Sequence, residues 1–318
     1  MPHFCTHSQC STCIGPALPE TLEELRQVMS VTRLGHDMET LALLGTQFDD
    51  VLITTRNTGA LVSGRGGYAP LQTTSGPLRL SQRRVSVRIA TNSELSLIHC
   101  QGDREARFPS ALAAVDRLGR VQHRVQYVSE FDACVAESLE PCEGYSLPQT
   151  PSFREVENVI SLPALRRARE GWDEADAGQH LNDLMVEMGK PRHKMLPYIG
   201  KEKAWRVLPQ VLQSFFNFLE GRRHSFTRFV PGTAVLQADV GAFERVNWFG
   251  SVFFSATQRG TFSLDLERVE HVWVTASPRH WQLEIYDADE RAMAVLAPDP
   301  NAASNQWRDF LLSLPRLG

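Results

Sequence analysis

Alternating apolar and polar positions predict β-strands in both halves of the chain. The clearest runs are Val85, Val87 and Ile89 in the first half and Phe262, Leu264 and Leu266 in the second. Successive side chains of a strand point to opposite faces, so a period of two indicates strands with one buried face. This pattern is typical of antiparallel sheets.

A helical period follows each sheet-rich stretch. Ser129 and Ser304 are suited to cap helices, because a serine oxygen at that position accepts a backbone N–H bond. Two apolar stripes at helical spacing come after them: Phe131, Val135 and Leu139 in the first, and Trp307, Phe310, Leu311 and Leu314 in the second. We expect both stripes to face the core, with Cys134 beside the first as a small core residue.

Two pairs of segments recur at nearly the same separation. The strand, turn and strand around Arg56 resemble those around Arg228, 172 residues later, and the polar turn at Asp116 resembles that at Asp287, 171 residues later. A constant offset of this kind indicates an internal repeat. The predicted fold is α+β, with two tandem repeats around a central cleft, each an antiparallel β-sheet packed with helices.

A stretch rich in Pro, Ser and polar residues separates the two repeats and predicts a linker. The second repeat opens with helices and enters its sheet near Ser225. The expected parts are a cysteine-rich N-terminal tail at 1–20, a first repeat at 21–140, a linker at 141–162 and a second repeat at 163–318.

Composition and charge narrow the class of protein. The 318 residues are 42% hydrophobic and 22% charged, which is the balance of an ordinary globular protein. A net charge of −4 and a pI near 6.2 give no electrostatic reason to bind nucleic acid or an anionic membrane. No apolar run approaches the roughly 18–20 residues that span a bilayer, and the N-terminus lacks a secretory pattern. We therefore expect a cytoplasmic protein.

The first residues carry an unusual group of metal-binding side chains. Cys5, Cys10 and Cys13 have the spacing Cys-x4-Cys-x2-Cys, with His3 and His7 alongside. Thiolates and imidazoles at such spacings bind zinc, and the cysteine pattern also supplies three of the four ligands of some iron–sulfur clusters. The alternative is a thiol-rich tail that binds no metal.

Six segments stand out by their order and spacing along the chain. They are the strand that ends in Thr55-Arg56-Asn57, Gly66-Gly67-Tyr68, Val85-Ser86-Val87-Arg88-Ile89, His271-Val272-Trp273-Val274, Leu283-Glu284-Ile285-Tyr286-Asp287-Ala288-Asp289 and Gln306-Trp307-Arg308. Together they resemble the HemS/ChuS-type family of haem-trafficking and haemin-degrading proteins, over roughly residues 40 to 315. This resemblance implies a cleft between the halves that holds one haem. The iron would be bound by a His from the second half and faced by an Arg from the first.

The family's iron ligand falls on a helix expected at 173–188. Alignment there places Gln179 at the ligand position, and His180 comes one residue later. One residue turns a side chain by about 100° around a helix, so the change is not neutral. His180 borders the apolar stripe of this helix and is the candidate ligand, with His193 as a substitute. The alternative for His180 is a half-buried histidine without a ligand.

Two arginines match other positions of the family's haem site. Arg88 falls at the family's Arg opposite the iron, and Arg192 at an Arg that holds a haem propionate. For each of these arginines, the alternative is an ordinary charged side chain on the protein surface. The family's Arg-Lys-Pro is replaced by Ala276-Ser277-Pro278, which removes a basic propionate partner and weakens the match.

The resemblance implies binding and trafficking of haem in bacterial haem-iron utilisation. Its partners would be haem, a haem oxygenase or a haem-uptake transporter, and a homodimer is left open. A second hypothesis is an enzyme that opens the haem ring with bound iron, oxygen and an external reductant. A third is a diverged member without haem that binds a metal or acts as a regulator.

Overall fold

The structure is a computed structural model that describes residues 19–35, 37–70, 81, 84–90, 95–102, 108–127, 129–141, 161–175, 177–185, 190–219, 225–278, 280–299 and 305–317. The candidate metal ligands Cys5, His7, Cys10 and Cys13 lie outside these ranges, as does most of the expected linker. Among the helices of the described residues, none is long and apolar enough to cross a membrane.

Among its described residues, the first half of the chain carries three helices and seven strands. In chain order these are α1 (Leu22–Val28), β1 (Ser30–Arg33), α2 (Met38–Gly45), β2 (Leu52–Arg56), β3 (Ala60–Arg65), β4 (Ser86–Ile89), β5 (Ser96–Gln101), β6 (Ala111–Val115), β7 (Val121–Gln126) and α3 (Glu130–Glu137).

The second half opens with three helices and continues with strands, as the sequence predicts. The elements are α4 (Leu162–Gly171), α5 (Ala177–Met185), α6 (Lys190–Ile199), β8 (Ala204–Val207), α7 (Val211–Leu219), β9 (Ser225–Pro231), β10 (Val235–Ala242), β11 (Arg245–Phe249), β12 (Val252–Ala256), β13 (Gly260–Asp265), η2 (Leu266–Arg268), β14 (His271–Ala276), β15 (Trp281–Tyr286), β16 (Ala292–Pro298) and α8 (Asn305–Ser313).

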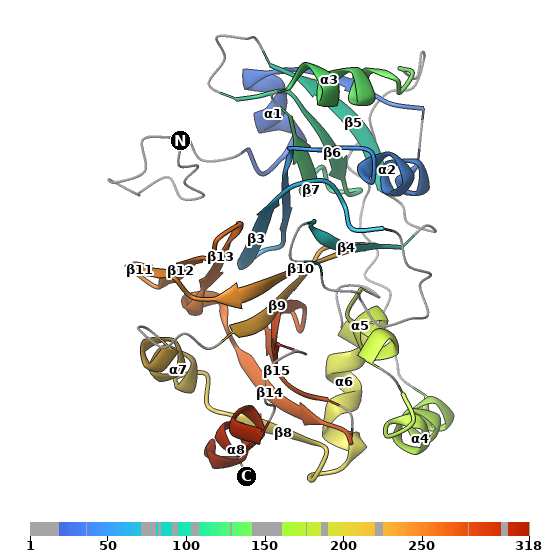
Figure 1. Cartoon of the computed structure of the whole chain (residues 1–318). Coiled ribbons are helices and arrows are strands. Elements are labelled where there is room, and N and C mark those ends of the chain that lie inside the picture. The colour runs from blue at the N-terminus through green and yellow to red at the C-terminus, as the bar shows by residue number, and fades with distance from the viewer. Residues whose placement is uncertain are drawn as a thin grey trace.

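The strands form two antiparallel sheets, and one lies largely above the other in the view of Figure 1. One sheet has nine strands in the order β1-β5-β6-β7-β2-β3-β13-β12-β11, and the other has seven in the order β4-β10-β9-β16-β15-β14-β8. The mixed α+β class with antiparallel sheets is confirmed. The boundaries of the two repeats stay a prediction.

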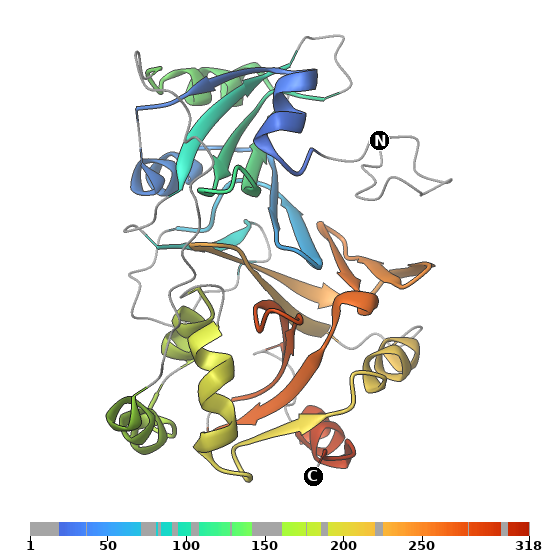
Figure 2. The same ribbon diagram turned by 180° about the vertical axis from the view of Figure 1, so that it is seen from behind.

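The two sheets have matching strand orders. Read from β8, the seven-stranded sheet runs β8-β14-β15-β16-β9-β10, which is the same sequence of positions as β1-β5-β6-β7-β2-β3 in the other sheet. Each run is then extended by one strand from the opposite half: β13 pairs with β3, and β4 pairs with β10. Figure 2 shows this exchange from behind. Each sheet is therefore completed by the other half of the chain.

Helices cover both faces of each sheet. In the first half, α2 and α3 pack on one face and α1 on the other, where Leu25 and Met29 contact the core. In the second half, α7 and α8 bury an aromatic-rich core against one face, and α5 and α6 pack on the other. The central strands are thus covered on both faces, so polar side chains on them are buried as well, whereas the edge strands β1 and β11 keep exposed residues.

A buried polar chain joins the halves. The Thr55 hydroxyl donates to Gln237 Oε1 of the second half at 2.8 Å and lies 2.7 Å from His123 Nδ1. His123 Nε2 lies 2.6 Å from the Tyr68 hydroxyl. Burial lowers the pKa of His123 to about 3, so the ring is neutral. Assigning the ring proton to Nδ1 satisfies every member of this chain.

The buried face of α3 differs in part from the prediction. Ser129 caps this helix as expected, but Phe131 is 60% exposed and Cys134 is exposed too. Val135 packs against the core and Leu139 is buried in it, as expected, and the helix also buries Asp132 and Ala136. Asp132 accepts hydrogen bonds from the backbone N–H groups of Asp49 and Asp50, and this tether leaves the Phe131 side of the helix in solvent.

Candidate functional site

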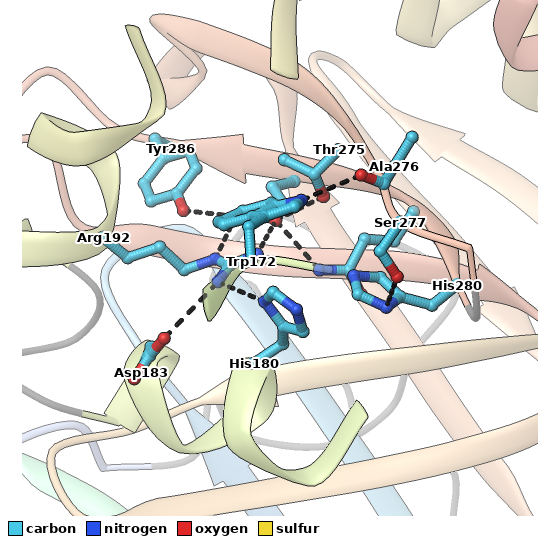
Figure 3. Close-up of polar contacts among 11 residues, drawn as sticks. Trp172, His180, Asp183, Arg192, Thr275, Ala276, Ser277, His280 and Tyr286 are labelled. Atoms are coloured by element: carbon cyan, nitrogen blue, oxygen red, sulfur yellow. Dashed lines mark hydrogen bonds and ion pairs between the residues drawn. The ribbon is translucent and has the colours of Figure 1, made fainter. Parts of the chain in front are cut away.

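A cluster of buried charged and titratable groups lies between α5, α6 and the seven-stranded sheet (Figure 3). Glu284 of β15 stands at its centre with no exposed surface. Its carboxylate accepts hydrogen bonds from five donors: Arg192 Nε at 2.9 Å, Arg192 Nη2 at 2.6 Å, Thr275 Oγ1 at 2.5 Å, Gln282 Nε2 at 2.9 Å and Tyr286 Oη at 2.6 Å. A buried carboxylate with this many donors is ionised and fixed in place.

Arg192 reaches this carboxylate from α6. Its guanidinium uses Nε and Nη2 on Glu284, while Nη1 donates to His180 Nδ1 at 3.0 Å and lies 3.7 Å from Asp183 Oδ2. Burial alone would raise the pKa of Glu284, but the Arg192 charge and the hydrogen bonds outweigh it and lower that pKa to about 2. The pair is therefore charged on both sides at neutral pH.

Trp172 covers the cluster. The Arg192 guanidinium carbon lies 4.9 Å from the centroid of its ring, within cation–π range. The indole N–H donates to the backbone oxygen of Ala276 at 2.9 Å, which fixes the ring over the site. Trp172 also meets the His180 ring edge-on, with centroids 4.6 Å apart.

His180 is held inside this cluster and is 2% exposed. Burial, and then the neighbouring charge of Arg192, lower its pKa to about 3, so the ring is neutral. Because Arg192 donates to Nδ1, the ring proton belongs on Nε2. That Nε2 is buried and has no hydrogen-bond partner in the described part of the chain.

His280 lies beside His180 at a centroid distance of 4.2 Å. Its Nδ1 is 2.6 Å from the Ser277 hydroxyl, and burial lowers its pKa to about 4. Ser277 also lines a surface pocket of about 280 Å³ together with Lys203, Trp281 and Arg308. This pocket is smaller than the roughly 300–1,000 Å³ of ordinary ligand sites, so we do not assign it a ligand.

His193 lies one residue after Arg192 on the same helix but in different surroundings. Its ring stacks on His271 at 4.8 Å and tilts against Tyr286 at 4.8 Å. Burial lowers its pKa to about 4. Neither ring nitrogen has a hydrogen-bond partner among the described residues, although Nδ1 lies 3.8 Å from Glu290 Oε1.

Arg88 lies where the two halves meet. It is on β4, the first-half strand that pairs with β10, and is 3% exposed. Its Nη1 donates to Asn182 Oδ1 of α5 at 2.7 Å. Arg88 and α5 are therefore neighbours, as the sequence resemblance implies, but the arginine is buried on a covered face.

The structure brings His180 and Arg192 into direct contact and places Arg88 against the same helix as His180. Sequence reasoning missed the group that organises them, Glu284, and its donor Tyr286. Both alternate with Leu283 and Ile285, so a single-faced strand would expose them. The only available signal was a carboxylate inside a strong β-pattern.

Solved structures relate this chain to known proteins, whereas sequence comparisons do not. No protein-family model and no curated protein sequence matches it. Among solved structures it is similar to the holo form of PhuS, a heme-binding protein from Pseudomonas aeruginosa, with a TM-score of 0.70 and 19% identity over 90% of this chain and 87% of that one.

A second similar structure is ChuS, an E. coli heme oxygenase. The TM-score is 0.71 and the identity 17%, over 89% of this chain and 88% of ChuS. At such low identity the likeness shows a shared fold. Because it extends over nearly the whole of both chains, the arrangement of the two halves is shared as well.

Proposed function

We propose that this protein binds haem or a related tetrapyrrole and carries it within bacterial haem-iron utilisation. The observation that carries the proposal is the shared fold over nearly the whole chain with a heme-binding protein and a heme oxygenase. Fold likeness alone does not fix function, so the site has to be argued from this chain's own residues.

The junction of β4 and α5 is the proposed binding region. Arg88 there is a buried first-half cation that contacts a second-half helix through Asn182. A guanidinium in this position can bind a carboxylate or an oxygen ligand, because its fork of N–H donors matches them. A bound ring would compete with Asn182 for Arg88.

The side chains around His180 do not fit an axial iron bond as they are arranged. Iron needs an imidazole nitrogen with a free lone pair. In His180 the Nδ1 lone pair accepts from Arg192, and Nε2 carries the proton. The Nε–H and Nη2–H groups of Arg192 both donate to Glu284, so a haem propionate would have to displace the Glu284 carboxylate. His193 keeps both nitrogens without hydrogen bonds and is the substitute ligand.

A haemin titration of the purified protein followed by absorbance tests the proposal. We expect a saturable one-to-one change in the Soret band, and Arg88→Met should weaken binding by about ten- to a hundredfold, since a charge-assisted hydrogen bond contributes about 1.5–3 kcal/mol. His180→Ala and His193→Ala, with His99→Ala as a control in the first half, show which histidine reaches iron. No saturable change in the wild-type protein would refute haem binding.

Ring opening is the second candidate, and the heme oxygenase among the similar structures favours it. It is tested by adding ascorbate to the haem complex. Steady loss of the Soret band, with formation of an open-chain product, would assign degradation. An unchanged band would assign carriage alone.

The remaining features of the proposal follow if the protein transports haem. The protein would act in the cytoplasm, receive its cargo from a haem-uptake transporter or pass it to a haem oxygenase, as a monomer or a homodimer. Within the described residues, no three His, Cys, Asp or Glu side chains gather as they would around a metal ion. Zinc or an iron–sulfur cluster on Cys5, Cys10 and Cys13 therefore rests on their spacing alone.

A further inference from the structure

A second buried guanidinium lies in the first half of the chain, and it has no counter-charge among the described residues. Arg124 of β7 is 3% exposed. Its only hydrogen bond in the described structure is a weak one from Nη2 to the Met29 sulfur at 3.8 Å. Nε and Nη1 are both buried without a partner among the described residues. Each of these two N–H groups is thus a buried donor without an acceptor in the described part of the chain.

Two neighbouring side chains share this condition. Gln126 lies two residues along the same strand, on the same face as Arg124, and Thr54 is directly opposite Arg124 on β2. Both are at least 96% buried. The Thr54 hydroxyl, and both polar atoms of the Gln126 amide, have no partner where the structure is described. The three side chains together offer guanidinium, amide and hydroxyl donors to one patch of the sheet.

The repeat shows what the other half does at the matching place. Ala113 and Arg124 are directly opposite each other on β6 and β7, and Glu284 and Val295 are directly opposite each other on β15 and β16. Each residue of the first pair precedes its counterpart by 171 residues, the offset that also relates the two β-turns. The second half thus buries a carboxylate at this level of its sheet, and α6 neutralises it with Arg192.

In the first half the covering helix supplies no such partner. Helix α1 buries Leu22 and Leu25, while its acids Glu23 and Glu24 face solvent. Cys100, the titratable neighbour that acts on Arg124, is neutral, because burial raises the pKa of its thiol to about 11. Arg124 is therefore a cation in a dry layer without an anion.

A charge of this kind is costly to keep. Removing an ion from water costs several kcal/mol unless a partner compensates, and an unmade hydrogen bond adds to the cost. Arginine cannot avoid this cost by deprotonation, because its side chain stays charged at any ordinary pH. A folded state that retains this group is best explained by an acceptor that comes from outside the chain.

We propose that Arg124, Gln126 and Thr54 form a binding site for a small carboxylate anion. The positive charge of Arg124 attracts a carboxylate, one of its unpartnered N–H groups can donate to a carboxylate oxygen, and the Gln126 amide and Thr54 hydroxyl supply further donors. The ligand is small, because every donor atom is enclosed beneath α1 and beside Ala111 and Ala113. This site is independent of haem binding at the β4–α5 junction.

Thermal unfolding of the full chain with sodium formate tests this site. Formate replaces sodium chloride at constant ionic strength, and its concentration is raised until the response saturates. A ligand that binds only the native state raises Tm, by about 2–4 °C at ten times its Kd. We expect this rise in the wild-type protein and in the control Arg245→Met, whose arginine is exposed on β11, and no rise in Arg124→Met.

Two outcomes would overturn the proposal: no saturable rise in the wild-type protein, or an equal rise in Arg124→Met. Circular dichroism checks that the variant is folded. If Arg124→Met does not fold, Thr54→Val and Gln126→Leu take its place, and each should raise the formate concentration at half-saturation several-fold. An unchanged concentration in both variants would contradict the site. Neither result depends on haem binding.

Discussion

At the scale of single residues, buried charge defines the candidate site. Glu284 lies in a strand whose neighbours Leu283 and Ile285 are core residues, and its own face is covered by α5 and α6. The Arg192 fork makes this burial tolerable by binding both oxygens. Burying such a pair adds little net stability, but leaving one member alone is expensive.

This asymmetry predicts the effect of Arg192→Met. The variant leaves Glu284 ionised and without its cation, so the free energy of unfolding should fall by about 3–5 kcal/mol. The double variant Arg192→Met/Glu284→Gln should recover much of that loss. Urea unfolding at pH 7 measures both.

The exposed ion pair of Arg65 and Asp50 supplies the control. Arg65→Met should cost less than about 1 kcal/mol, because an exposed pair is screened by solvent. If Arg192→Met costs no more than Arg65→Met, the Arg192–Glu284 pair does not organise this part of the core.

At the scale of elements, the orientation of α3 shows a polar anchor overriding part of an apolar stripe. Asp132 is buried and accepts from the Ser129 hydroxyl at 2.6 Å as well as from two backbone N–H groups that precede β2. The charge-assisted bonds fix one helical face inward. Phe131 is left in solvent as the consequence.

Asp132→Ala should therefore loosen the contact between α3 and the segment before β2. The two N–H groups would lose their acceptor, and we expect a loss of about 1–3 kcal/mol in the free energy of unfolding. Glu130→Ala, an exposed acid in the same first turn, is the matched control and should stay within about 0.5 kcal/mol. Equal effects of the two variants in denaturant unfolding would show that Asp132 is not an anchor.

At the scale of the molecule, the two sheets depend on each other. Strand β4 of the first half pairs with β10 of the second half, and β13 of the second half pairs with β3 of the first half. The buried chain from Tyr68 through His123 and Thr55 to Gln237 ties the same junction. Separating the halves would expose two sheet edges and a buried polar network.

Residues 21–140 expressed alone should consequently fail to form a stable monomer. An exposed β3 edge invites pairing with another chain, and β4 would have no sheet to join. Size-exclusion chromatography with light scattering, followed by thermal unfolding, tests this expectation. A monomer with a cooperative transition would show that the first half folds without the strand pairing between the halves. The full chain is the control.

Local patterns in the sequence were enough to predict the α+β class, several strands and helices, and the offset of the repeat. Alternation, turn chemistry and capping depend on nearby residues, so periods of two and 3.6 along the chain revealed them. The positions expected for Arg88 and His180 came instead from the resemblance to the HemS/ChuS-type family, because no local pattern brings the two halves together.

Which strands pair across the halves, which faces are covered and which charged groups contact each other depend on the packing of the folded chain. Arg192 and Glu284 are 92 residues apart, and no local pattern pairs them. The sequence could not indicate that α6 covers one face of β15 while α1 leaves Arg124 without an acid. Such contacts depend on how the layers pack, because burial, which sets both the cost of a charge and the need for a partner, exists only in the folded chain.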